Sequence, residues 1–86
     1  MTAFVLLEIL ATRNRREAVM FQKMVAIGPM NTADKTKAEK FDSQATAMKC
    51  PAFHHALSFY QVVPVDQIDA VAANLIGEGD AKGGGA

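Results

Sequence analysis

The most apolar stretch of the chain lies at its start: Met1-Thr2-Ala3-Phe4-Val5-Leu6-Leu7-Glu8-Ile9-Leu10-Ala11. One carboxylate, Glu8, interrupts this stretch, and basic residues follow it from Arg13. A bilayer span needs about 20 apolar residues, roughly twice what this run offers. A signal peptide carries its positive charge before the apolar run, whereas here the charge follows it. The stretch is therefore interpreted as a core segment with no membrane partner.

Beyond this run, apolar residues continue to recur at steps of three and four, which is the spacing of one face of a helix. No glycine or proline interrupts the segment before Gly28-Pro29, a strong stop signal. The pattern predicts one long helix over residues 3–27, although its first ten residues also fit a buried strand. The predicted interface is the apolar face of this helix, which consists of Phe4, Leu7, Ala11, Asn14, Ala18, Phe21 and Val25.

The middle of the chain predicts a short polar helix and then a strand. The helix is expected over residues 35–48, after a capping turn at 31–34. Pro51 ends it. Aromatic and β-branched residues in residues 53–63 then favour a strand. Alternation along that strand predicts one buried apolar face, made of Phe53, Leu57, Phe59 and Val63.

The end of the chain predicts an amphipathic helix over residues 65–76, capped by Gly77. Residues 78–86 are rich in glycine and predict a flexible tail. With 86 residues and a mass of 9.2 kDa, the chain is expected to form one small domain over residues 1–77. The predicted class is α+β, and an all-α three-helix arrangement is the alternative.

Composition narrows the chemistry that the chain can carry. Nine basic residues balance nine acidic residues, so no overall field attracts nucleic acid or an anionic membrane. The single cysteine, Cys50, excludes an internal disulfide and fits a reducing compartment, so the cytoplasm is the expected location. His54 and His55 are the candidate metal ligands, although neighbouring residues of a strand point to opposite faces. No cofactor is predicted.

Arg13, Arg15 and Arg16 form the one basic cluster that could contact phosphates. On a helix the three side chains cannot share one face. A solvated face with ion pairs is therefore the favoured interpretation of the cluster, and nucleic-acid binding is the alternative.

The segment Lys49-Cys50-Pro51-Ala52-Phe53-His54-His55-Ala56-Leu57-Ser58-Phe59 resembles a strand of the relaxases of mobilisable plasmids. The following residues, Asp66 to Gly77, are similar to the next helix of that family, and Glu8 to Asn14 are faintly similar to a segment before the strand. Relaxases nick one DNA strand with a tyrosine nucleophile and a histidine-held divalent metal. This chain ends before the family's His-x-His motif, and Tyr60 follows the strand that the family's tyrosine precedes. The resemblance therefore implies a piece without complete nicking chemistry, in which Tyr60 has no catalytic role.

Two functions follow as expectations. The first is a non-enzymatic interaction or assembly module that forms a homo-oligomer or packs into a larger protein assembly. It is favoured because a lone strand needs a partner and no complete catalytic constellation is recognisable. The second is a truncated relaxase-like DNA-processing fragment or accessory.

Overall fold

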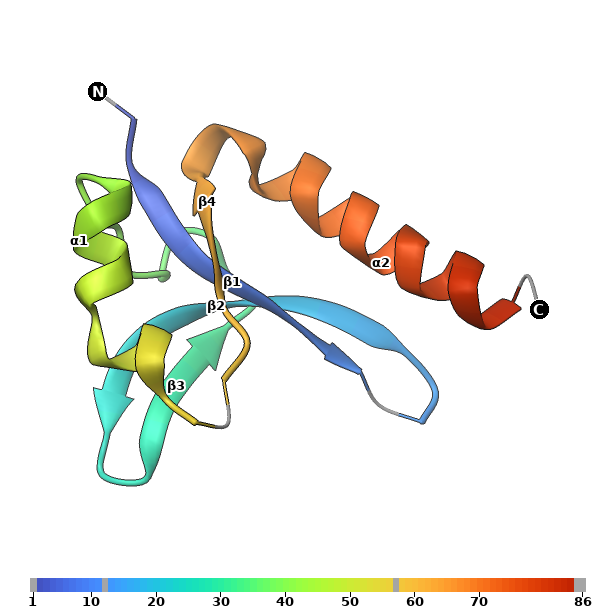
Figure 1. Cartoon of the computed structure of the whole chain (residues 1–86), viewed down its shortest axis with the longest axis horizontal. Helices are drawn as coiled ribbons and strands as arrows, with labels where there is room; N and C mark the ends of the chain where they lie inside the picture. Colours follow the sequence, from blue (N-terminus) through green and yellow to red (C-terminus); the bar gives the residue numbers. More distant parts are fainter. Residues whose placement is uncertain (1, 12, 57, 85–86) are drawn as a thin grey trace.

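In the computed structural model, residues 2–11, 13–56 and 58–84 are described, and within them four antiparallel strands form one sheet at the centre of the protein (Figure 1). The strand order is β3-β2-β1-β4, so β1 and β2 are central. The strands are β1 (Phe4–Ala11), β2 (Arg16–Val25), β3 (Gly28–Thr32) and β4 (Gln61–Pro64).

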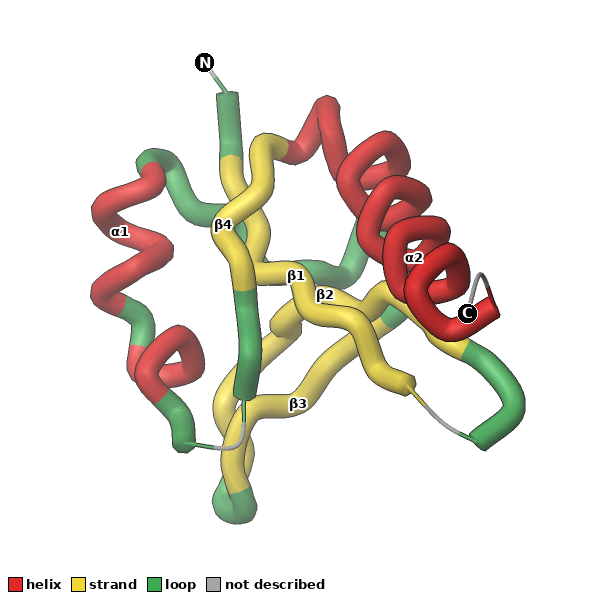
Figure 2. Tube along the Cα trace, turned by 45° about the vertical axis from the view of Figure 1, so that its right-hand side comes forward, coloured by secondary structure: helices red, strands yellow, loops and turns green. Residues whose placement is uncertain are grey.

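Helices cover both faces of this sheet (Figures 1 and 2). On one face, Val5, Leu7 and Met20 pack against α2 (Ile68–Gly84), which the short 3-10 turn η2 (Val65–Gln67) precedes. The other face packs against α1 (Gln44–Lys49) and the 3-10 turn η1 (Pro51–His54). Its core consists of Leu6, Phe21, Ala47, Ala52 and Tyr60, with Phe41, Cys50, Phe53 and Val62 packed around it.

The predicted long helix over residues 3–27 is wrong, and so are both predicted fold classes: this segment is the β1–β2 hairpin. The apolar run is buried on both faces of a central strand, and Val5, Leu6 and Leu7 are each 0% exposed. A strand buried on both faces shows no polar alternation, so its apolar run resembles that of a helix. Gly28-Pro29 does not end a helix but begins β3.

Two further predicted elements also differ from the structure. The polar helix predicted over residues 35–48 is reduced to α1, which begins after Ser43, whose hydroxyl accepts the Thr46 N–H at 3.1 Å. The strand predicted over residues 53–63 is confined to β4. Its first two residues, Phe53 and His54, belong to the turn η1, in which Pro51 is the first residue.

The C-terminal helix agrees with the sequence on its apolar face. Five of the six residues predicted for this face pack on the sheet, and Ile76 is the one that does not belong to that cluster: Val65, Ile68, Val71, Ala72 and Leu75. The helix continues past Gly77 to Gly84, so the predicted cap at Gly77 is wrong. The last two residues of the predicted tail lie outside the described residues. Within the described part of the chain, no helix has the length and apolar character needed to cross a membrane.

Two glycines give a matched stability test. Gly28 has a φ of 136°, and a Cβ there would lie 3.2 Å from Nε2 of His55. Gly28→Ala is expected to cost about 1–3 kcal/mol. Gly77 lies inside α2 with nothing near its Cβ position, so Gly77→Ala should stabilise by about 0.5–1 kcal/mol. Urea unfolding of both variants measures whether each change lowers or raises the free energy of unfolding. If Gly77→Ala destabilised the protein, it would contradict the helix at that position.

Candidate interaction surface

The buried carboxylate of Glu8, a residue of β1, binds groups of β3 and of the segment that leads into β4. Glu8 is 8% exposed and faces the same side of the sheet as Leu6. Its Oε2 accepts the backbone N–H of Phe59 at 3.0 Å, and its Oε1 accepts Nδ2 of Asn31 at 3.3 Å. The hydroxyl of Tyr60 donates to Oδ1 of Asn31. Glu8 therefore ties three segments together, because a buried charge is stable only when hydrogen bonds satisfy it.

Beyond Leu7, β1 and the segment before β4 separate. The β1–β4 pairing covers Phe4–Leu7, whereas the β1–β2 pairing continues to Ala11. Figures 1 and 2 show the end of β1 turning away from the chain that enters β4. At the point of separation the Phe59 N–H is bound by the Glu8 side chain. Among the described residues, no strand therefore pairs with Ile9–Ala11 on the β4 side of β1.

Two large apolar side chains border this unpaired part of β1. Phe59 is 83% exposed, and Leu10 is 43% exposed. Leu10 lies two residues from Glu8 and so on the same face of β1, while Glu8 binds the backbone N–H of Phe59. We call Ile9–Ala11 together with Phe59 the open-edge surface. Large exposed apolar side chains beside an unpaired strand are typical of interaction sites.

The exposure of Phe59 corrects the prediction that it belongs to a buried strand face. Phe53 packs on the core that faces α1, the α1 cluster, whereas Val63 packs on the core that faces α2. These two residues therefore lie on opposite faces of the sheet. The fourth member of the predicted face, Leu57, lies outside the described residues. A side chain that is 83% exposed has little packing to lose.

We therefore expect Phe59→Ser to change the free energy of unfolding by only about 0.5 kcal/mol. Thermal or urea unfolding of the variant measures this directly. A loss comparable to that of a buried phenylalanine, about 3–5 kcal/mol, would show that Phe59 is buried in solution.

Tyr60 makes the stability of the fold depend on pH. Burial raises the pKa of its phenol from 10.0 to about 12, and the nearby Glu8 charge adds to the effect. In the unfolded chain the phenol ionises from about pH 10, while in the folded protein it stays protonated up to about pH 12. The unfolded state thus loses its proton first, and stability falls with rising pH across this window.

Tyr60→Phe should abolish that contribution above pH 10 and cost about 1 kcal/mol at neutral pH, because Asn31 loses its donor. Urea unfolding at a series of alkaline pH values compares the two proteins. Identical pH profiles for wild type and variant would contradict the buried position of this phenol.

The predicted interface residues do not form one surface. Leu7 is buried against α2, whereas Phe21 is buried in the α1 cluster on the opposite face. Phe4 is half-buried and exchanges hydrogen bonds of 2.8 Å with Phe41. The remaining members are spread along the hairpin: Ala11, Asn14 and Val25 are exposed, and Ala18 is half-buried. Because the helix does not exist, its apolar face does not exist either.

The arginine cluster lies at the connection between β1 and β2. Arg13 and Arg15 lie in the connection between β1 and β2, and Arg16 begins β2 directly opposite Ala11. All three are exposed, and Arg15 forms an ion pair of 2.9 Å with Glu17. The turn places this positive charge at the end of the open-edge surface.

The two candidate metal ligands are directed to different partners. Nε2 of His54 lies 2.7 Å from the carbonyl oxygen of Met48, and the ring of His55 lies against Gly28. Within the described residues, no group of three or more His, Cys, Asp or Glu side chains is placed to hold a metal ion. Cys50 is half-buried in the α1 cluster.

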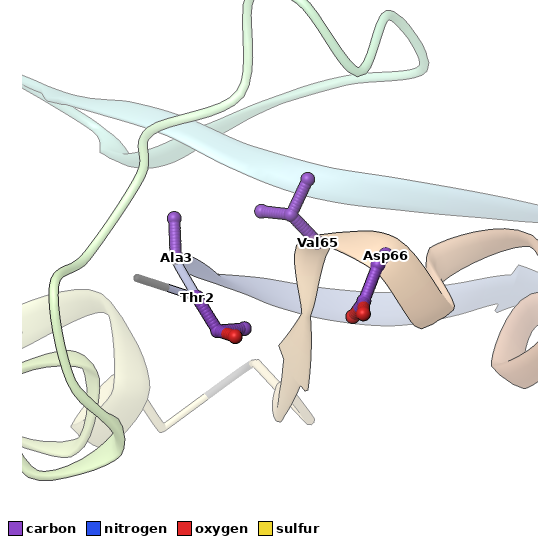
Figure 3. A pocket seen from close by; sticks show the side chains of 4 residues that line it. All are labelled: Thr2, Ala3, Val65 and Asp66. Atoms are coloured by element: carbon purple, nitrogen blue, oxygen red, sulfur yellow. The ribbon is translucent and has the colours of Figure 1, made fainter.

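One cavity of about 340 Å³ lies near the beginning of β1 (Figure 3). Thr2 and Ala3 line it from one side, and Val65 and Asp66 line it from the other. The Val65 N–H donates to the Ala3 carbonyl at 2.9 Å between these two sides. With one carboxylate and one hydroxyl among its lining residues, the cavity offers few groups for recognising a ligand.

Sequence reasoning missed the two residues that shape the open-edge surface, Glu8 and Phe59. Glu8 could have been recognised, because it is the one charged residue in an apolar run of eleven. A carboxylate in such a run needs hydrogen-bond donors, and these indicate a junction between segments. Comparison with models of protein families, with curated proteins and with solved structures finds no match for this chain.

Proposed function

We propose that this protein is a non-enzymatic interaction module that joins a larger protein assembly through its open-edge surface. The observation that carries the proposal is Phe59, a large aromatic side chain that is 83% exposed and whose backbone is fixed by the buried Glu8. Aromatic side chains held in place lose little conformational entropy on binding, and they dominate the energy of many interfaces.

A second exposed apolar residue provides an internal control. Ile27, in the turn between β2 and β3, is 94% exposed. It lies at the opposite end of β2 from Arg16 and thus away from the arginine turn. Exposure alone therefore does not identify a surface, and the two positions can be compared directly.

The experiment places a photoreactive phenylalanine analogue at position 59 or at position 27 in living cells and identifies the adducts by mass spectrometry. The partner found at position 59 is then purified and titrated with the protein. Phe59→Ser should weaken its binding by about tenfold or more, and Ile27→Ser should leave it unchanged. Equal affinity of the partner for wild type and Phe59→Ser would contradict the proposal.

A second candidate is a relaxase-like DNA-processing accessory, in which Arg13, Arg15 and Arg16 contact phosphates. It is favoured by the position of the three arginines, which lie at or next to one exposed connection between strands. Fluorescence anisotropy with labelled single-stranded DNA tests this candidate. Binding that weakens with salt and is lost in the triple alanine variant would support it, and no binding at low salt would exclude it.

A further inference from the structure

We infer that the open-edge surface binds an extended, acidic segment of the partner protein, which adds to the sheet beside Ile9–Ala11 as a further strand. This inference rests on the proposed function and specifies the partner of the same surface. It depends on three properties of the site: the direction of the backbone groups of β1, the proline residues of the edge strands, and the charge of the arginine turn.

The backbone of β1 directs hydrogen-bonding groups to the open side. In an antiparallel ladder, alternate residues of a strand bond to alternate neighbours. The Val65 N–H donates to Ala3, so Ala3 bonds to the β4 side, whereas Phe4 bonds to Phe41 on the other side. The alternation continues along β1, so Ile9 and Ala11 direct their N–H and C=O groups to the β4 side of the strand. The pairing with β4 ends at Leu7, before it reaches these residues. A strand added there can bond to both residues.

The two edge strands of the sheet are less suited to the same contact. β3 contains Pro29, which has no N–H to donate. Pro64 in β4 pairs with Phe4, whose own bonds face away from β4, so Pro64 occupies an outward-facing position without a donor. Proline in an edge strand is a common means of preventing strand addition. The residues Ile9 to Ala11 contain no proline.

The charge of the arginine turn selects the chemistry of the occupant. Residues 13–17 contain three arginines and one acidic residue, Glu17, so the formal charge of this stretch is positive. Acidic side chains at one end of the added strand would lie beside this turn, while an apolar side chain would pack against the exposed Leu10. Opposite charge then fixes the direction of the added strand.

A second copy of the chain fits this edge less well. If two copies paired antiparallel along Ile9–Ala11, the arginine turn of each would meet the segment before β4 of the other. That segment, from Ser58 to Gln61, contains no charged residue. Glu8 cannot serve as the acidic partner, because it is buried and already accepts two hydrogen bonds.

The test uses a short synthetic peptide that alternates valine and threonine and carries aspartates at one end. Amide NMR of the whole protein should show slowed hydrogen exchange at Ile9 and Ala11 when this peptide is added. A peptide with lysines in place of the aspartates, and an aspartate peptide with N-methylated alternate amides, should both bind about tenfold more weakly.

Two pairs of variants locate the contact. Arg13→Glu should weaken peptide binding by about tenfold, whereas Lys49→Glu, the same charge change at the end of α1, should not. Ala11→Pro removes one outward N–H and should weaken peptide binding, while Ala26→Pro in the turn between β2 and β3 should leave peptide binding unchanged.

Each alternative result overturns the inference in a recognisable way. Suppose that binding of the purified partner requires Phe59, but neither the partner nor the peptide slows hydrogen exchange at Ile9 and Ala11. Strand addition is then wrong, and the proposed function stands. If these amides are protected in a concentration-dependent dimer without peptide, the occupant is a second copy. If single-stranded DNA, and no peptide, perturbs Arg13 and Leu10, the surface binds nucleic acid, and the proposed function fails as well.

Discussion

Leu6→Ala is expected to unfold most of the protein at moderate urea concentrations. Leu6 is 0% exposed in the α1 cluster, and truncating a buried leucine costs about 2–5 kcal/mol. A domain of this size has only about 5–10 kcal/mol of stability in total. Leu7→Ala should be equally severe, because Leu7 is 0% exposed on the opposite face.

Leu10→Ala, in the same strand, is the matched control. Leu10 is 43% exposed, so its truncation should cost about 1 kcal/mol or less. Urea unfolding of the three variants separates a strand buried on both faces from a helix with one apolar face. A helix would place Leu7 in the core and Leu6 beside it, so a near-neutral Leu6→Ala would contradict the sheet.

Glu8→Ala is the second change with a large expected effect. It leaves the Phe59 N–H and Nδ2 of Asn31 without their acceptor. Both bonds are part-buried, so water replaces part of what the carboxylate supplied, and we expect a loss of about 1–3 kcal/mol. The amide of Phe59 should also lose its protection from hydrogen exchange, because its backbone is no longer fixed.

Glu17→Ala provides the comparison for Glu8. Glu17 pairs with Leu10 in the ladder and forms an ion pair with Arg15, but its side chain is 39% exposed. Surface ion pairs contribute about 1 kcal/mol or less. Equal stabilities of the two alanine variants would show that the Glu8 carboxylate is solvated and holds nothing in place.

The elements that the sequence predicts well are those with one buried face. α2 has a single apolar stripe, and its contacts with the sheet follow from helical spacing alone. Pro64 correctly marks the boundary between β4 and this helix. Where one face is buried and the other is solvated, periodicity carries the information directly.

The N-terminal hairpin could not be predicted in this way for two physical reasons. Val5, Leu6 and Leu7 are buried on alternating faces by different helices, so the period of two disappears. The turn between β1 and β2 contains no glycine or proline to mark it. The apolar steps of three and four between Phe4 and Val25 therefore fitted a helix by coincidence.

The open-edge surface depends on contacts that are distant in the sequence. Glu8 and Phe59 are 51 positions apart and meet only because β4 pairs with β1. The alternation that was expected to bury Phe59 fails because β4 begins at Gln61, after Phe59. Without knowledge of that pairing, Phe59 is indistinguishable from a core aromatic residue.

Amide hydrogen exchange in the free protein tests whether the end of β1 is open. The β1–β4 pairing ends at Leu7, where Glu8 binds the Phe59 N–H, so Ile9 and Ala11 are available to a partner strand. Val5 and Leu7, paired with β4, should then exchange slowly, while Ile9 and Ala11 should exchange fast although they belong to the same strand. Equal protection of all four amides in the monomer would show that the edge of β1 is already occupied and that no partner strand binds there.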